Sequence, residues 1–402
     1  MRLRLTAFAL LAAAAPATLA AQNMSVEQKA VSEPAGKAVP ISAADLLAPY
    51  YRELASQVDL PQAPVGAAAD AGMTLTRFAF GSCYSENREQ TIWRNIAQTD
   101  PQLFMMIGDN VYGDTNWRGD AELGTLRASY AKLASHPAFA EFRGQVPMLT
   151  TWDDHDYGFN DGGREFAFKG WAETIYETFW NSPDDVRARP GVYESRMFGP
   201  EGQRVQVILL DTRFFRSPLQ RLELAGGPRP PLGPYVANTS PDSDMLGTEQ
   251  WRWLAEELKK PADLRLVVSS IQVLTDAHNF EAWTTMPGQR DKLYQLLAAR
   301  NGGGVLLLSG DRHAGGIYRD TPAAFGGEEL WEITSSSLNF AFTDTATNTA
   351  REPDPKRVTD FISEENFGMV EIDWPRQELR LSLRGKEGEV RTTQTVGWTP
   401  PR

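Results

Sequence analysis

The chain has 402 residues, of which 42% are hydrophobic and 23% are charged, and this composition is that of a globular protein and argues against a disordered one. The formal net charge of -12 argues against a general nucleic-acid surface, because phosphate backbones are bound by an excess of Lys and Arg. The single cysteine, Cys83, excludes an intramolecular disulfide.

The N-terminus predicts an export signal over residues 1–21. Arg2 and Arg4 precede an apolar stretch that is too short to span a bilayer, and small residues suited to cleavage follow near Ala20 and Ala21. No later stretch is apolar enough for a membrane helix, so we expect no transmembrane anchor. These features predict a mature protein that is periplasmic or secreted.

The segment that follows, residues 22–70, is rich in Ala, Pro, Ser and Gln. We interpret it as an N-terminal linker or arm that contains one short helix, in "SAADLLAPYYRELASQV". From residue 71 to residue 402 the pattern of apolar and polar residues is that of one compact domain.

Six apolar runs in this domain have the length of buried strands; five are followed directly by polar residues, and the other, "LRLVVSSIQV", has Gln272 near its end. In chain order they are "LTRFAFGSC", "QLFMMIGDN", "VPMLTTWDDHD", "VQVILLDTR", "LRLVVSSIQV" and "GVLLLSGDRH". Helical patterns separate most of them, which predicts an α/β fold with a largely parallel sheet. Because the carboxyl ends of the strands line the ligand crevice of such a fold, we expect the polar residues after the strands to meet there.

Three segments near the C-terminus, "FGMVEIDW", "ELRLSLRG" and "EVRTTQTV", alternate apolar and polar residues and predict an antiparallel meander that completes a second sheet. Two connections, residues 216–247 and 341–359, are long enough to cover the crevice. For the second of them an unstructured surface loop is the alternative.

The side chains that follow the strands are of the types that bind metal ions. They are Cys83, Asp109, Asn110, Tyr112, Asp153, Asp154, His155, Asn160, Asp211, Arg213, Asp311, Arg312 and His313. Four or five carboxylates in one crevice repel one another, and bound cations relieve that repulsion. Oxygen ligands suit Ca, Mg or Mn, whereas a thiolate with a His and a phenolate indicates a transition metal, so two kinds of metal subsite could coexist. The absence of paired cysteines and of an H-E-x-x-H helix disfavours a simple tetrahedral zinc site.

Each of these fragments has a structural alternative when it is taken alone. An Asp-Asn pair after a strand is often turn chemistry, and a single His is often a hydrogen-bonded core residue. The repeated placement favours a functional interpretation, because two of only four histidines, His155 and His313, stand among acids at strand ends. His136 and His278 are interpreted as structural.

Cys83 has two alternatives to a role as metal ligand. One is a buried Cys that acts as a small hydrophobic residue. The other is a nucleophile in a phosphate loop, which needs an Arg six residues later; here Arg88 is fifth and Glu89 is sixth. Ser82 as nucleophile is disfavoured because "FGSCY" lacks the G-x-S-x-G elbow.

The ordered set "GSC", "GDNVYGD", "WDDHD", "DTR" and "GDRH" resembles the alkaline phosphatase D, or PhoD-like, branch of the metallophosphoesterases, over roughly residues 75–340. The resemblance implies a four-layer αββα sandwich, in which helices flank two central mixed sheets. It also implies an active site that contains Fe³⁺ with Ca²⁺, other divalent metals being possible. Export by a twin-arginine signal is common in that family, whereas here Leu3 separates Arg2 from Arg4.

The resemblance also implies roles for individual residues. Asp109 would bridge the metals, Tyr112 would provide a phenolate and Cys83 a thiolate, His313 would bind the iron, and Asp311 would be a further ligand. Asp154 and His155 resemble the Asn-His pair of the wider superfamily, in which one residue is a ligand and the other faces the phosphoryl oxygen or leaving group. The remaining implied residues are Asp153 and Asn160 as calcium ligands and Asp211 as a weaker correspondence. Apart from the resemblance, Arg312 and Arg164 are candidates for binding the substrate's remaining oxygens.

These inferences predict an exported metal-dependent phosphoesterase that acts on small-molecule or polymeric phosphomonoesters, phosphodiesters or both. The predicted reaction is direct attack by a metal-activated hydroxide, with His155, Asp109 and Arg312 as catalytic residues and no phosphoenzyme. The alternatives are a diester-specific phosphodiesterase or phospholipase, a non-catalytic metal-holding protein and, third, a cysteine-dependent hydrolase. The sequence carries no indication of the oligomeric state.

Overall fold

The computed structural model describes residues 42–222, 232–342 and 344–398. The predicted export signal, residues 1–21, lies outside the described residues, as do residues 22–41 of the expected arm. None of the described helices is both long and apolar enough to cross a lipid bilayer.

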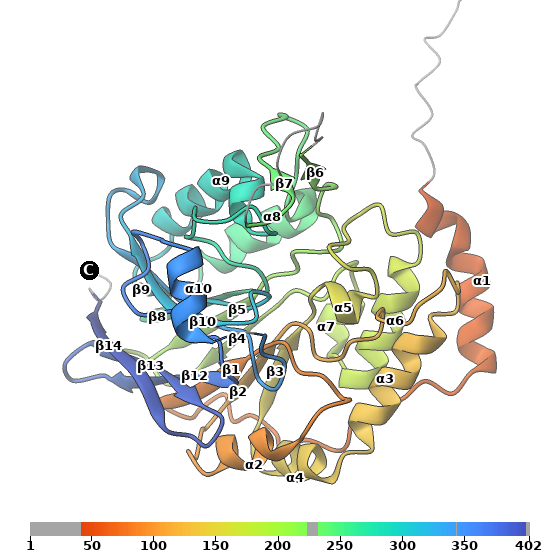
Figure 1. The fold of residues 1–402 in the computed structure, drawn as a ribbon, viewed down its shortest axis with the longest axis horizontal. Coiled ribbons are helices and arrows are strands. Elements are labelled where there is room, and N and C mark those ends of the chain that lie inside the picture. The colour runs from red at the N-terminus through yellow and green to blue at the C-terminus, as the bar shows by residue number, and fades with distance from the viewer. Residues whose placement is uncertain (1–41, 223–231, 343, 399–402) are drawn as a thin grey trace, which may run out of the picture. The chain divides into compact units, whose positions relative to one another are not determined.

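Two six-stranded mixed sheets lie at the centre of the fold (Figure 1). Their strands are β1 (Arg77–Gly81), β2 (Phe104–Ile107), β3 (Met148–Thr151), β4 (Glu194–Phe198), β5 (Val205–Leu209), β8 (Leu264–Ser269), β9 (Gly304–Ser309), β10 (Gly315–Asp320), β11 (Leu330–Ser335), β12 (Asn366–Asp373), β13 (Glu378–Gly385) and β14 (Val390–Gly397). The first sheet has the order β14-β13-β12-β1-β2-β3, and the second has the order β10-β11-β9-β8-β5-β4. A separate two-stranded ribbon pairs β6 (Gln220–Arg221) with β7 (Tyr235–Val236).

The parallel strands are those that the sequence predicts as buried runs. β1, β2 and β3 are parallel in the first sheet, and β5, β8 and β9 are parallel in the second, where β11 joins them. The two central sheets that the resemblance implies are confirmed, and the six predicted runs are divided between them. Strands covered on both faces are apolar throughout, so the apolar pattern alone does not reveal which sheet a strand joins.

The predicted C-terminal meander is confirmed as β12, β13 and β14, paired antiparallel. It joins the sheet of the first predicted strands, because β12 pairs antiparallel with β1. The strands β4, β10 and β11 were not predicted; β4 and β10 are antiparallel edge strands of the second sheet.

Helices cover the outer face of each sheet. The helices of the described residues are α1 (Ala43–Gln57), α2 (Thr91–Ala97), α3 (Gly124–Ala134), α4 (Pro137–Gln145), α5 (Asp154–Tyr157), α6 (Lys169–Trp180), α7 (Asp184–Arg187), α8 (Gly247–Glu257), α9 (Pro287–Ala298) and α10 (Thr345–Arg351), with 3-10 turns η1 (Trp283–Thr285) and η2 (Ala323–Phe325). One of the helical stretches between the predicted strands, "TLRASYAKLASHPAFAEF", forms two helices, because Pro137 occupies the first position of α4 and separates it from α3.

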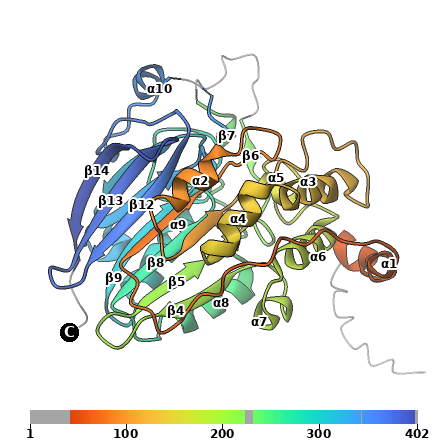
Figure 2. The ribbon, with the colours of Figure 1, turned by 90° about the horizontal axis from the view of Figure 1, so that it is seen from below.

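Three apolar clusters show the predicted four layers. Phe78 and Phe80 of β1 pack against residues of the second sheet, such as Val207, so this cluster lies between the two sheets. Ala79, on the opposite face of β1, belongs to the cluster formed with α2, α3, α4 and α6. Ile208, on the outer face of the second sheet, packs with residues of α8 and α9. Figure 2 shows α2 and α4 on one side of the strands and α8 on the other.

The helix expected within the N-terminal arm is α1. Ser42 caps its N-terminus by accepting a hydrogen bond from Asp45 N, and the Asp45 side chain accepts one from Ser42 N in return. Tyr51 is buried and stacks on Trp171 of α6 with ring centroids 5.4 Å apart. This part of the arm is therefore docked on the helices that cover the first sheet.

Candidate metal centre

The residues that follow β1, β2, β3 and β9 converge at the carboxyl ends of these strands. Their ligand atoms form three groups in which every atom lies within 4.8 Å of the others. The groups are Cys83 with Asp109 and His313; Asp109 with Asp154 and His155; and Asp109 with Asp153, Asp154 and Asp311. Asp109 belongs to all three, so its carboxylate lies where a bridging ligand between two cations would lie.

The backbone at these turns is held in an uncommon conformation. Cys83, Asp109, Asp311 and His313 have φ angles of 56°, 48°, 66° and 52°, in the left-handed region that residues other than glycine seldom adopt. Non-glycine residues in this region cluster at functional sites, where the surrounding structure compensates the strain. Four of the candidate ligands therefore share a backbone feature that is typical of binding sites.

Glycines next to two of these residues allow the strand ends to approach one another. A Cβ atom on Gly108 would lie 2.6 Å from Cβ of Asp153, and a Cβ atom on Gly310 would lie 2.3 Å from Oγ of Ser82. No side chain larger than hydrogen fits at either position without movement of its neighbours. The glycines of the two "GD" motifs thus permit the close packing that brings the ligands together.

One side of the centre combines sulfur, phenol and imidazole. Sγ of Cys83 lies 3.3 Å from Oδ2 of Asp109, and the Tyr112 hydroxyl lies 3.5 Å from the same oxygen and 3.3 Å from Nε2 of His313. Nδ1 of His313 lies 2.7 Å from the carbonyl oxygen of Phe340, which can only accept a hydrogen bond. Nδ1 therefore carries the proton, and Nε2 presents its lone pair toward Tyr112. Burial lowers the pKa of His313 to about 4, which keeps this imidazole neutral.

The other side of the centre consists of carboxylates. Burial raises the pKa of Asp109 and of Asp311 well above the usual range, and for Asp311 the neighbouring Asp153 and Asp154 raise it further. Oδ2 of Asp153 and Oδ1 of Asp154 are buried and have no hydrogen-bond partner among the described residues. Buried carboxylate oxygens without partners are costly unless a cation binds them. These oxygens therefore fit a hard cation such as Ca²⁺ or Mg²⁺, and the sulfur, phenol and imidazole fit a transition metal.

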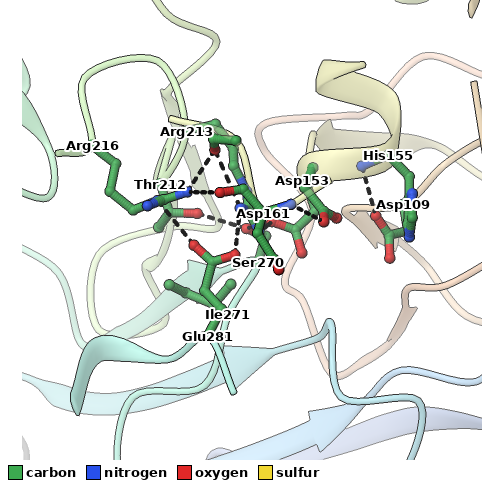
Figure 3. A network of polar contacts seen from close by, with 12 residues as sticks. Asp109, Asp153, His155, Asp161, Thr212, Arg213, Arg216, Ser270, Ile271 and Glu281 are labelled. Atoms are coloured by element: carbon green, nitrogen blue, oxygen red, sulfur yellow. Dashed lines mark hydrogen bonds and ion pairs between the residues drawn. The ribbon is translucent and has the colours of Figure 1, made fainter. Parts of the chain in front are cut away.

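His155 lies beside this centre on α5. Its Nδ1 is 2.7 Å from Oδ1 of Asp114, and its backbone N–H points to Oδ1 of Asp109 at 3.4 Å, a contact drawn in Figure 3. Burial lowers its pKa, but the carboxylates of Asp154, Asp109 and Asp114 outweigh that effect and raise the pKa to about 11. Before any cation binds, His155 is therefore an imidazolium held in place by Asp114.

A buried ion-pair network supports Asp153 from the opposite direction. Nε of Arg213 donates to Oδ1 of Asp153 at 2.6 Å, and Ser270 donates to the same oxygen at 2.6 Å. Arg213 also pairs with Glu281 at 2.5 Å, and Glu281 pairs with Arg216 at 2.9 Å. Figure 3 shows Arg213, Arg216 and Glu281 gathered beside Asp153. Because Oδ1 of Asp153 is occupied by the network, only Oδ2 is left for a cation. Burial raises the pKa of Asp153 to about 6, although Arg213 lowers it.

Sequence reasoning missed several of these residues. Asp114 is the last residue of the motif "GDNVYGD". The sequence shows its spacing from Asp109, but it does not show that Asp114 contacts His155. Asp156, the last residue of "WDDHD", accepts hydrogen bonds from Asp153 N at 2.6 Å and Asn110 N at 3.2 Å, and so joins the turns after β2 and β3. Glu281 lies in no motif, and no feature of the sequence indicated it.

Not all predicted residues lie at the centre. Asn160 is exposed on the wall of the adjoining cleft. Arg312 lines the same cleft, where it forms an ion pair with the buried Glu352. Arg164 is exposed and lines neither of the clefts described below. The Asp211 carboxylate accepts hydrogen bonds from the backbone of Val192, at 3.0 Å, and of two residues in its own turn, so its contacts are those of a turn-stabilising residue.

Two clefts meet at the centre and share His155, His313 and Phe342. The first, of about 650 Å³, extends past Tyr112 to the loop after β1 and to α3. The second, of about 440 Å³, extends past Asp154 and Asp311 to Arg312 and α10. Leu232, Asn348 and Arg351 line the second cleft, so both long connections contribute to the crevice as the sequence analysis allowed.

The thiol of Cys83 does not have the surroundings of a nucleophile. Its residue has no exposed surface, and burial raises the pKa of the thiol well above its usual range, with further contributions from the Asp109 and Asp311 carboxylates. A reactive cysteine has a lowered pKa and an exposed sulfur. The structure therefore disfavours the cysteine-dependent hydrolase and is compatible with the two other roles, a buried hydrophobic residue and a metal ligand.

Comparison with known proteins gives a consistent result. A family model described as PhoD-like phosphatase matches residues 78–161 and 181–383, which include every candidate ligand. Alkaline phosphatase D of Bacillus subtilis (strain 168) is 24% identical over 281 residues, or 61% of this chain. The match covers 47% of that protein, so the chain spans about half the length of this curated relative.

A solved structure entitled "Structure of PhoD" shares the fold. It superimposes with a TM-score of 0.59 at 20% sequence identity, and the match covers 82% of this chain and 70% of that one.

Proposed function

The chain belongs to the PhoD-like phosphatase family, and from this premise we propose that it is a metal-dependent phosphoesterase. The observation that carries the proposal is the presence of the Asp109 carboxylate in all three groups of clustered ligand atoms. Such an arrangement suits two cations held close together, which is the requirement of metal-assisted phosphoester hydrolysis. The centre also lies at the junction of two clefts, where a phosphoester could reach it.

The donor set supports Fe³⁺ on one side and Ca²⁺ on the other. Cys83, Tyr112 and His313, together with Asp109, would hold the iron, since anionic sulfur and phenolate ligands favour a ferric ion. Asp153, Asp154 and Asp311 would complete the calcium site, with Asn160 within the same cleft as a further candidate. When bound, the metal ions lower the pKa of a water molecule and withdraw charge from the phosphoryl oxygens.

The chain's own residues would orient the substrate and move a proton. His155 is held by Asp114 beside the ligand group of Asp109 and Asp154, where its ring can donate a hydrogen bond to a phosphoryl oxygen or to the leaving group. Arg312 lines the second cleft and is held by Glu352 and by Phe280, whose ring centroid lies 4.5 Å from the guanidinium carbon. A guanidinium in this place can bind the remaining substrate oxygens.

The proposal is tested with p-nitrophenyl phosphate and bis-p-nitrophenyl phosphate. The purified protein is stripped of metals with EDTA, reconstituted with iron and calcium, and compared with Asp109→Ala and with Glu141→Gln, an exposed control on α4. We expect hydrolysis by the wild type and the control and a loss of about 10³-fold or more in Asp109→Ala, because that change removes a ligand from both metals. Activity that survives in Asp109→Ala, or an inactive reconstituted wild type, contradicts the proposal.

A preference for phosphodiesters is the second candidate. It is favoured by the two clefts that leave the centre in different directions, because a diester carries two organic groups. Steady-state constants for the two nitrophenyl substrates, with product identification, distinguish it from a monoesterase. A larger kcat/KM for the monoester contradicts the diester preference.

Export is proposed from residues 1–21 alone, and a periplasmic or secreted location would supply calcium to the site. N-terminal sequencing of the mature protein from cell fractions tests it: a protein that begins near residue 22 outside the cytoplasm supports export, and an intact Met1 in the cytoplasm contradicts it.

A further inference from the structure

We propose that the first cleft contains an anion subsite, formed by Arg88 and Lys132, which selects phosphoesters whose organic group carries a second negative charge. The inference rests on the proposed phosphoesterase function, because it concerns the substrate of the same centre. It concerns the described residues that line this cleft, which include Arg88, Lys132 and the candidate ligands Tyr112 and His313.

Arg88 is placed one aromatic ring away from the centre. Its guanidinium carbon lies 3.9 Å from the centroid of the Phe340 ring. That ring packs in turn on Tyr112, at 4.7 Å, and on His313, at 4.8 Å between centroids. The stacking orients the planar guanidinium, so that its donors are pre-organised for a planar or tetrahedral anion. Arg88 is therefore close enough to the centre to bind one end of a substrate molecule whose phosphoryl group lies at the centre.

Neither cation is neutralised by the protein. Arg88 makes one long hydrogen bond, of 3.5 Å, to the Asn339 carbonyl, and Lys132 donates to the Asn87 side chain at 2.6 Å. Neither forms an ion pair with any acid in the described parts of the chain, although the whole chain carries a net charge of -12. The one acid of the cleft, Glu86, is buried and accepts hydrogen bonds from Tyr112 N and Asn87, so its carboxylate is already occupied.

The second cleft differs in how its charges are paired. Besides Arg312 and Arg351 it is lined by five acids, namely Asp154, Asp161, Glu281, Asp311 and Glu352. Glu281 and Glu352 form ion pairs with arginines, among them Arg312, and Asp154 and Asp311 are candidate cation ligands. Arg88 and Lys132 have no acidic partner among the described residues, so they are free to attract an anionic substituent of the substrate into the first cleft.

The wall of the first cleft combines polar and apolar side chains. Thr125, at the start of α3, is one of the polar residues that line it. Phe340 and Phe342 provide an apolar surface on the other side. The cleft volume of about 650 Å³ is that of a typical small-molecule site. The geometry thus suits a short organic spacer between the phosphoryl group and the second anion.

The experiment compares two monoesters of similar shape, 4-carboxyphenyl phosphate and its neutral analogue 4-carbamoylphenyl phosphate. The ratio of their kcat/KM values is measured for the wild type, Arg88→Met, Lys132→Met and the double variant. Because each variant is compared by its own ratio, the different leaving-group reactivities cancel. Arg252→Met, an exposed position on α8 that lines neither cleft, is the matched control.

We expect the preference for the carboxylate substrate to fall about threefold to tenfold in each single variant and further in the double variant, the range expected for a charged contact at a partly exposed site. The control should keep the wild-type ratio, and 1 M salt should reduce that ratio in the wild type, since exposed charges are screened.

The possible failures are distinguishable. If the wild type hydrolyses both substrates and the ratio is unchanged in the double variant, the anion subsite is overturned and the phosphoesterase proposal stands. If the reconstituted wild type hydrolyses neither substrate nor p-nitrophenyl phosphate, the phosphoesterase proposal is contradicted and the subsite is overturned with it.

Discussion

The sulfur atom of Cys83 lies 3.3 Å from Oδ2 of Asp109, although the two residues follow different strands of the first sheet. Without a cation this pair is unfavourable as two anions, because burial and the Asp109 carboxylate both raise the pKa of the thiol. A bound metal reverses this, since coordination deprotonates a thiol outright. We therefore expect the protonation state of the Cys83 thiol to depend on whether a metal ion is bound at the centre.

Replacing Cys83 should weaken iron binding more than calcium binding. Cys83→Ser keeps the size of the side chain but substitutes a poor ligand for the thiolate. We expect natively purified Cys83→Ser to contain less iron per chain than the wild type and a similar amount of calcium, as measured by elemental analysis. An unchanged iron content would show that the sulfur is not a ligand.

Loss of Asp114 should impair catalysis and leave metal binding intact. The Asp114→Asn change removes the charge that holds Nδ1 of His155 at 2.7 Å. Outer residues that orient functional histidines typically contribute 10-fold to 100-fold. We expect kcat to fall by roughly this factor with little change in KM or in metal content. Equal loss of activity and of bound metal would instead assign Asp114 to the metal site.

Removal of Arg213 should destabilise the fold. Its side chain is fully buried between Asp153 and Glu281, so Arg213→Met leaves the buried Asp153 carboxylate without its ion-pair partner and Glu281 with Arg216 alone. Breaking a buried pair in this way costs on the order of 3–5 kcal/mol. The matched control is Arg380→Met, whose exposed pair with Glu371 should contribute about 0–1 kcal/mol. Urea unfolding of the metal-free proteins measures both, and similar values for the two variants would contradict the role assigned to the network.

The stability of the protein should depend on pH through Glu173 of α6, which is remote from the candidate ligands. Burial raises the pKa of Glu173 from 4.5 to about 8 in the folded state. The folded state therefore binds more protons than the unfolded state between these values, so this contribution to the free energy of unfolding is complete below pH 4.5 and is lost as the pH rises toward 8.

The variant Glu173→Gln tests this dependence, because it keeps an acceptor for Gly191 N and removes the charge. We expect it to be more stable than the wild type at pH 8.5 and to lose less stability between pH 5 and pH 8.5, as followed by urea midpoints. Glu141→Gln, exposed on α4, is the control. Parallel pH profiles for wild type and Glu173→Gln would refute the prediction.

Removal of metal should lower the thermal stability, because the four clustered aspartates then repel one another. We expect EDTA to lower the Tm of the wild type and calcium to restore it. Asp311→Asn removes one of these charges and should show a smaller effect of EDTA. An identical decrease in Tm for both proteins would indicate that the cation binds elsewhere.

The sequence by itself determined which segments are buried strands and that polar residues follow them. Both are local properties: burial on two faces requires a continuous apolar run, and a strand that ends at a crevice is followed by residues that tolerate a tight turn. The order of "GSC", "GDNVYGD", "WDDHD" and "GDRH" was therefore readable before the fold was known, and so were the candidate ligands Cys83, Asp109, Asp154 and His313.

Only the tertiary structure decided how these strands are divided between two sheets and which charges neutralise which. Arg213 and Glu281 are 68 residues apart, and their ion pair depends on the path of the chain between them, which no local pattern encodes. Asn160 and Arg164 are also of residue types that are common in binding sites. In the structure, Asn160 is exposed on the wall of the second cleft, and Arg164 is exposed outside it. The sequence specifies the chemistry of each side chain, but two side chains become neighbours only when distant segments pack together. This packing places Asp109 next to the candidate ligands on both sides of the centre.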